Sequence, residues 1–174
     1  MNSAFIKAII ILPGTALVYI PALVVYFTRN TPYAATFPPD SIFLWLATLL
    51  FAVAGLCLMI WAMILFNTKG GGGTPAPWQP IQNLIILGPY RYVRNPMLSG
   101  VNLFLVAEAL ALQSLPVFIW GIVFVVLNTI YFVKLEEPEL EKRYGAAYTR
   151  YKNGVPRWIP RLTPYQGEEE PHPE

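Results

Sequence analysis

Charged residues are scarce in this chain of 174 residues, and so are cysteine and histidine. Asp, Glu, Lys and Arg make up 13% of the sequence, against roughly 25% in soluble domains. The formal net charge is only +2 and the basic residues form no runs, so binding to nucleic acid is not expected. Hydrophobic residues reach 55% and the mean hydropathy is +0.47. This composition predicts a membrane protein made of a single domain.

The lone cysteine and the lone histidine exclude further kinds of site. Cys57 has no partner cysteine, so the chain forms no internal disulfide and gives no information about its redox compartment. His172 lies in an acidic tail that contains proline. We therefore expect neither a catalytic histidine nor a metal site built on histidine, and this removes most zinc and copper chemistry.

Four apolar stretches approach the length of about 20 residues that a membrane-crossing helix needs. They comprise residues 4–26, 42–66, 97–115 and 117–135. We therefore expect an all-α integral membrane protein with about four transmembrane helices, of which the last two form a helical hairpin. No small-residue cleavage site follows the first stretch cleanly, so we do not expect a cleaved signal peptide.

The basic residues are distributed very unevenly about these spans. With four spans, 11 of the 12 lysines and arginines lie on one side and only Arg29 lies on the other. The positive-inside rule makes the first side cytoplasmic, together with both termini. The loop of residues 67–96 is then cytoplasmic too. Its glycines and prolines suit a flexible linker, but Trp78 and the run 84–87 favour an ordered lid over a ligand.

The predicted hairpin has two feet, which are its two ends on the cytoplasmic side, and the first of them carries a site for an anion. Asn95 and Pro96 form a helix-start signal, because Asn caps a helix well and Pro suits its first position. The N–H groups of a helix N-terminus bind a carboxylate, and Arg91 and Arg94 would add charge-assisted hydrogen bonds. The alternative for these two arginines is to reach out to lipid phosphates.

The other foot and the interior of the hairpin carry acids. Glu136 and Glu137 end the fourth span, where acids oppose the helix dipole. Either the helix continues past Pro138, which moves that penalty downstream, or these acids hold cationic or hydroxyl groups of a ligand or pair with the arginines. Glu108 is the one acid deep within a span, which makes it a functional candidate. Its structural alternative is a neutral Glu hydrogen-bonded to Asn128.

The segment after the hairpin has helical spacing. Over residues 138–174, a helix is followed by Trp158 and then by an acidic tail. Its aromatic stripe consists of Leu140, Tyr144, Tyr148 and Tyr151. We expect this helix to lie in the membrane interface, with Trp158 as a further aromatic anchor.

Taken in order, these residues resemble the isoprenylcysteine carboxyl methyltransferase family, in its small bacterial branch of integral membrane enzymes. That family has an Arg-His/Asn-Pro-x-Tyr element, a helical hairpin, a Glu-Glu pair, a Leu, a Phe/Tyr-Gly pair and two tyrosines. The matching residues are Arg94, Asn95, Pro96, Met97, Glu136, Glu137, Leu140, Tyr144, Gly145, Tyr148 and Tyr151. Segments 73–77 (GTPAP) and 155–160 (VPRWIP) also resemble the bacterial branch.

The resemblance implies S-adenosylmethionine as methyl donor, bound at the cytoplasmic face of a bacterial inner membrane. The candidate cofactor-binding residues are Tyr90, Arg94, Asn95, Glu136, Glu137 and Tyr148, and the candidate catalytic residues are Glu108 and Arg94. One departure is Leu98, which stands where the family has tyrosine and so alters a contact with cofactor or substrate.

The acceptor is expected to be lipid-like, and to carry a carboxylate, a thiol or an amine. A carboxylate needs no general base, whereas a thiol or an amine does. Asn102, Glu108 and Asn128 would form a polar cavity that such an amphiphile enters sideways from the bilayer. Two alternatives remain: a membrane reductase of the steroid-reductase type that uses a nicotinamide nucleotide, or a non-catalytic membrane partner with a degenerate site. The oligomeric state is left open.

Overall fold

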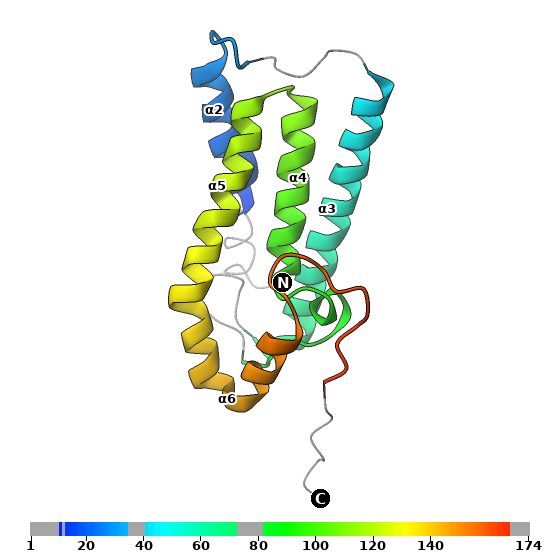
Figure 1. The fold of residues 1–174 in the computed structure, drawn as a ribbon, viewed down its shortest axis with the longest axis vertical. Helices are drawn as coiled ribbons and strands as arrows, with labels where there is room; N and C mark the ends of the chain where they lie inside the picture. Colours follow the sequence, from blue (N-terminus) through cyan, green and yellow to red (C-terminus); the bar gives the residue numbers. More distant parts are fainter. Residues whose placement is uncertain (1–10, 12, 35–40, 73–81, 168–174) are drawn as a thin grey trace, which may run out of the picture.

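The computed structural model describes residues 11, 13–34, 41–72 and 82–167, and over these residues it is helical with no strands. Figure 1 shows α2, α3, α4 and α5 side by side along the long axis, with α6 folding beneath their lower end. The predicted all-α class is confirmed. The elements are a π turn η1 (Thr15–Tyr19), α2 (Ile20–Thr28), α3 (Ile42–Lys69), a 3-10 turn η2 (Gly88–Arg91), α4 (Pro96–Ala111), α5 (Leu115–Tyr131), a π turn η3 (Phe132–Glu136) and α6 (Glu137–Gly154).

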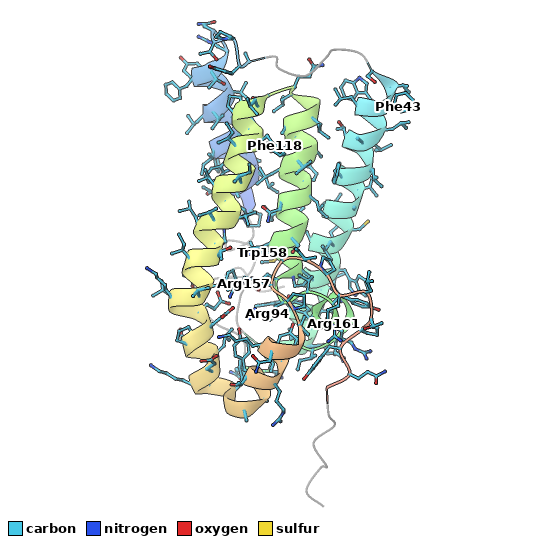
Figure 2. All side chains as sticks on the ribbon, viewed as in Figure 1. Phe43, Arg94, Phe118, Arg157, Trp158 and Arg161 are labelled. Atoms are coloured by element: carbon cyan, nitrogen blue, oxygen red, sulfur yellow. The ribbon has the colours of Figure 1, made fainter. Side chains whose placement is uncertain are left out.

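Two helices in the described part of the chain are long and apolar enough to span a membrane: α3 and the continuous helix Leu115–Gly154. Only 17% and 6% of the residues in their most apolar windows are buried, whereas the core helix of a soluble protein would be mostly buried. Bulky apolar side chains such as Phe43 and Phe118 point outward from them (Figure 2). These outward faces favour a membrane environment. Helices α2 and α4 are shorter, so the four-span topology stays a prediction.

Helices α3 and α4 pack more extensively than any other pair, because two glycines let their backbones approach. A Cβ atom at Gly100 would lie 2.7 Å from the carbonyl oxygen of Gly55, and a Cβ at Gly55 would lie 2.7 Å from that of Gly100. Small residues at a helix crossing are the usual means of close packing between membrane helices. The α3–α4 pair therefore forms a closely fitted wall of the molecule.

The helix that begins with α5 continues through η3 into α6, past Pro138. Proline lacks an N–H and its ring crowds the carbonyl four residues earlier, which disturbs a regular α-helix. The π turn Phe132–Glu136 lies directly before this proline, where the wider turn accommodates the disturbed hydrogen-bond ladder. The first alternative for Glu136 and Glu137, a helix that continues, is thus correct, and the pairing with an arginine in the second alternative also holds for Glu137, which contacts Arg94.

Helix α6 bends at Gly145, and its second half turns back under the other helices (Figure 1). Gly145 has φ 56° and ψ −134°, values that residues with a side chain rarely adopt. The bend turns the aromatic stripe inward, so Tyr148 and Tyr151 are buried against Leu84 and Tyr165. The stripe therefore packs inside the protein, and the position of this helix in the membrane interface stays a prediction.

The predicted uneven distribution of charge holds over the described residues. Arg29 follows α2 at the upper end, whereas the other described lysines and arginines belong to the end of α3, to η2, to the foot of α4, or to η3 and the residues after it (Figure 1). The assignment of the lower end to the cytoplasm stays a prediction. Residues 73–81 of the predicted lid, which include Trp78, lie outside the described residues.

We expect the stability of the protein to depend on the close contact between Gly55 and Gly100. Gly100→Ala should lower the free energy of unfolding by about 1–3 kcal/mol, because its new methyl group would meet the backbone of α3. The matched control is Gly121→Ala, whose Cβ would sit 3.7 Å from that of Leu105, an ordinary contact. Thermal unfolding in detergent, followed by circular dichroism, measures both. Equal midpoints for the two variants would contradict the proposed close contact.

Candidate functional site

A cavity of about 400 Å³ lies at the lower end of the molecule. Its walls come from η1, the foot of α4, α5, η3 and α6, and two residues of the predicted lid loop, Leu84 and Ile85, close one side. Its volume is within the range of small-molecule sites. The cavity is polar where η2, α4 and α6 meet and apolar between α4, α5 and η1, so it presents two chemically different ends.

Most of the predicted cofactor residues meet in this cavity. Five of them line it: Tyr90, Arg94, Asn95, Glu136 and Tyr148. They come from segments far apart in the sequence, so the fold brings together the two feet of the hairpin as the sequence predicts. Glu137 and Glu108, the other two predicted site residues, are not among the lining residues.

Glu137 is buried at 3% exposure and is held by three cations. Arg94 Nη1 donates to its Oε1 at 2.8 Å, Arg157 donates to the same oxygen through Nε and Nη2, and Lys152 Nζ lies 3.1 Å from Oε2. Burial opposes the ionisation of Glu137, but the hydrogen bonds from Arg157 and Lys152 and the charge of Arg94 outweigh it and lower the pKa of the carboxyl. This geometry gives Glu137 an ionic role behind the cavity wall, not a direct ligand contact.

The sequence prediction omitted Arg157 and Lys152, both of which hold Glu137. Lys152 also pairs with Glu141 at 2.9 Å. Arg157 belongs to the segment 155–160 that resembles the bacterial branch, and that segment was the available signal. The sequence pattern did not reveal that Arg157 pairs with Glu137, because the two residues are 20 positions apart, on opposite sides of the bend in α6.

Glu136 differs from its neighbour in that it lines the cavity without a hydrogen bond or an ion pair to any described residue. Burial first, and then the charges of Glu139 and Glu137, raise the pKa of the Glu136 carboxyl. Glu139 is itself paired with Arg143 at 2.9 Å. A half-buried carboxylate without a partner is costly, and a bound cation would relieve that cost.

The foot of α4 provides unpaired donors at the same end of the cavity. Helix α4 begins at Pro96 as predicted, but the Asn95 side chain makes no capping hydrogen bond. Instead its Nδ2, like Nε of Arg94, is buried with no described partner. The N–H groups of Met97 and Leu98, which line the cavity, belong to the first turn and have no partner within the helix. These donors fit an anionic group such as a carboxylate.

Two tyrosines support this end from below. The hydroxyl of Tyr151 donates to the carbonyl oxygen of Tyr90 at 2.7 Å, which ties α6 to η2. Tyr148 and Tyr151 are both buried and both line the cavity. They fix the distance between the acid-bearing helix and the segment that carries Arg94.

The opposite end of the cavity is lined by Ala16, Val101, Phe124 and Asn128. The indole Nε1 of Trp120 donates to the carbonyl oxygen of Ala16 at 3.0 Å, which joins η1 to α5 at this end. Asn128 Nδ2 donates to the backbone oxygen of Phe124 at 2.8 Å. Its carbonyl oxygen is then the polar acceptor that Asn128 presents on this mostly apolar wall.

The predicted polar cavity of Asn102, Glu108 and Asn128 does not form as a unit. Asn128 lines the cavity, whereas Asn102 and Glu108 do not. Glu108 lies about 10 Å along α4 from Val101, at 1.5 Å per residue. Its Oε2 and the Oδ1 of Asn102 are buried without a described partner. The catalytic role of Glu108 stays a prediction that this geometry does not support.

Comparison with protein families gives one match. A family model described as phospholipid methyltransferase matches residues 42–147, which is more than half of the chain. None of the curated proteins matches the chain significantly. The matched region begins with α3 and ends within α6, so it contains both feet of the hairpin but not Lys152 or Arg157.

We expect Glu137→Gln to be strongly destabilising, by about 3–5 kcal/mol, because it leaves three cations around a neutral side chain. Since the folded-state pKa is lowered, the stabilisation by Glu137 is present above the pKa of an unfolded glutamate. It is lost as the pH falls through the folded-state value. Thermal unfolding between about pH 7 and pH 3 should therefore show a shallower pH dependence in the variant than in the native protein.

The matched control is Glu141→Gln, which removes an ion pair of Lys152 at a side chain that is 40% exposed. This change should cost less than about 1 kcal/mol. The ionic role of Glu137 is refuted if both variants unfold at the same temperature.

Proposed function

The chain belongs to the phospholipid methyltransferase family, and on that premise we propose that it transfers a methyl group from S-adenosylmethionine to a lipid-like acceptor. The match agrees with the resemblance drawn from the sequence, since both families are membrane methyltransferases. The observation that carries the proposal is a single cavity lined by an unpaired acid, Glu136, and by Arg94 and Asn95, each of which has a buried nitrogen without a described partner.

The polar end of the cavity suits the charges of this donor. S-adenosylmethionine has a carboxylate, an ammonium, ribose hydroxyls and a sulfonium, and when bound it supplies an activated methyl group. Arg94, Asn95 and the first turn of α4 would hold the carboxylate. Glu136 would hold a cationic or hydroxyl group, and Tyr90 and Tyr148 would bound the site. Transfer itself mainly requires alignment, which the rigid foot of α4 and the helix of α5 and η3 would provide.

The apolar end suits the acceptor. Ala16, Val101 and Phe124 would contact a hydrocarbon portion, and the Asn128 amide oxygen would accept a hydrogen bond from the head group. We propose that the acceptor enters from the bilayer, because this end lies between helices whose outer faces are apolar. Two acids line the cavity, Glu136 and Glu139, and Glu139 pairs with Arg143. For an amine or a thiol, Glu136 is therefore the alternative proton acceptor when it does not hold the donor, since its raised pKa brings it towards neutral pH.

The reductase alternative has less support. A nicotinamide nucleotide carries a diphosphate, which requires cations that are available for it. Two arginines line the cavity, and Arg143 pairs with Glu139. Arg94, which suits the single charge of a carboxylate, would then face the two charges of a diphosphate while shared with Glu137. Leu98 lines the cavity where the resembling family has tyrosine. The other alternative, a degenerate site that binds no donor, is tested by the next experiment.

We expect Arg94→Gln and Glu136→Gln each to weaken donor binding at least about tenfold, the effect of one charge-assisted hydrogen bond. Calorimetry of the purified protein with S-adenosylmethionine and with S-adenosylhomocysteine measures it, with NADPH as the competing ligand. Because Glu136 has a raised pKa, its charge is present above that value and lost as the pH falls. Native affinity should therefore rise between about pH 5.5 and 8, and Glu136→Gln should lack this rise.

The control for this experiment is Glu141→Gln, which changes an acid on α6 that does not line the cavity. Its affinity and pH dependence should match those of the native protein. Native-like affinity in both Arg94→Gln and Glu136→Gln, with the fold intact, would remove the proposed site. Tighter binding of NADPH than of either S-adenosyl ligand would favour the reductase.

We expect Asn128→Leu to impair methylation of a membrane lipid extract severalfold while leaving donor affinity unchanged, because only the acceptor end loses a polar group. Incorporation of labelled methyl into the extract measures turnover, and calorimetry measures donor affinity. Glu108→Gln in the same assay tests the sequence-based prediction, and unchanged turnover would make Glu108 structural. Equal turnover of a fully water-soluble acceptor would exclude entry from the bilayer.

A further inference from the structure

A C-terminal strap, defined as residues 155–166, runs alongside the segment that carries Arg94. Three backbone hydrogen bonds join them: Arg94 N to Pro156 O at 2.9 Å, Arg161 N to Tyr92 O at 2.9 Å, and Tyr165 N to Arg91 O at 2.8 Å. Figure 1 shows this strap, in orange and red, crossing the lower ends of α3 and α4. The strap lies beyond the family-matched region, which ends at residue 147.

The strap is also fixed to the opposite wall of the cavity. The indole Nε1 of Trp158 donates to Thr129 Oγ1 of α5 at 2.8 Å. Arg157 donates through two nitrogens to Glu137, at the start of α6. Figure 2 places Arg157 close to Arg94 between α5 and α4. The strap thus connects the two feet of the hairpin through side chains as well as through its backbone.

Arg157 and Arg94 share one oxygen atom. Both guanidinium groups donate to Oε1 of Glu137, and Lys152 lies against Oε2. Lys152 also pairs with Glu141, so its charge is balanced there. Arg94 and Arg157 pair with Glu137 among the described acids, and two positive charges therefore meet one negative charge beside the foot of α4. Arg94 lines the cavity, whereas Arg157 does not. With 16% exposure of its side chain, Arg157 is also poorly screened by water.

We propose that Arg157 is a positioning residue of the donor site: it neutralises Glu137 from behind, so that Arg94 is held in the cavity with its positive charge available to a ligand carboxylate. The inference rests on the proposed function and deepens it, because it assigns the anion-binding strength of the cavity to a residue outside the matched region. Without Arg157, Arg94 would be the principal partner of Glu137, and less positive charge would face the ligand.

This role predicts a loss that depends on the chemistry of the ligand. S-adenosylhomocysteine carries the carboxylate, whereas 5′-methylthioadenosine has the same nucleoside and a thioether but no amino-acid group. Arg157→Gln should weaken binding of the first about tenfold and change binding of the second by less than about twofold. A purely structural role of Arg157 would weaken both ligands alike, because the whole cavity would be distorted.

The experiment is calorimetric titration of the full-length protein in detergent with these two ligands. The matched control is Lys142→Gln, which removes a positive charge from an exposed position of α6 outside the cavity. It should leave both affinities unchanged. Arg157→Lys keeps the charge but loses the two-pronged contact, so it should restore part of the lost affinity for S-adenosylhomocysteine. If Arg157→Gln does not fold, the two ligands are compared with Arg157→Lys instead.

The outcomes separate the two proposals. Loss confined to the carboxylate-bearing ligand, with partial rescue by Arg157→Lys, supports the positioning role. Equal loss for both ligands, or no loss for either, overturns it while leaving the proposed function in place. Failure of the native protein to bind S-adenosylhomocysteine overturns the proposed function, and the inference falls with it.

Discussion

The lower end of the molecule depends on one buried carboxylate. Glu137 joins the foot of α4 through Arg94, the far half of α6 through Lys152 and the strap through Arg157. A buried charge is tolerated only when its partners compensate for lost hydration, and here three do. The cavity lies on the other side of this cluster. A ligand site that borrows one of these cations is therefore built on the same contacts that stabilise the fold.

Much of this arrangement can be predicted from residue order. The start of α4 at Pro96 follows from local chemistry, because Asn precedes a Pro that suits the first turn of a helix, and an apolar stretch follows. The meeting of the hairpin feet follows from the lengths of the two apolar stretches between them. Arg94 and Glu137 are 43 residues apart and lie in direct contact. Length and capping are properties of a short segment, so a single sequence is enough to predict them.

The division of roles between Glu136 and Glu137 cannot be predicted in the same way. Consecutive helical residues point about 100° apart, so which of the two faces the cavity depends on the rotation of the helix about its axis. That rotation is affected by the π turn Phe132–Glu136 and its neighbour Pro138, which no periodicity reveals. The inward packing of the aromatic stripe of α6 could not be predicted for a related reason. Apolar residues packed in a core and apolar residues facing lipid have the same spacing, and only the bend at Gly145 separates them.

The hydrogen bond between Trp120 and Ala16 has a consequence for how the chain folds as it is made. Its two ends are 104 residues apart, whereas the contacts between α3 and α4 join segments that follow each other in the chain. During synthesis η1 appears first, yet its partner in α5 appears only after α3 and α4. The segment must therefore wait until most of the protein exists. A wall of the cavity that is synthesised early therefore takes its place only after α5 has been made.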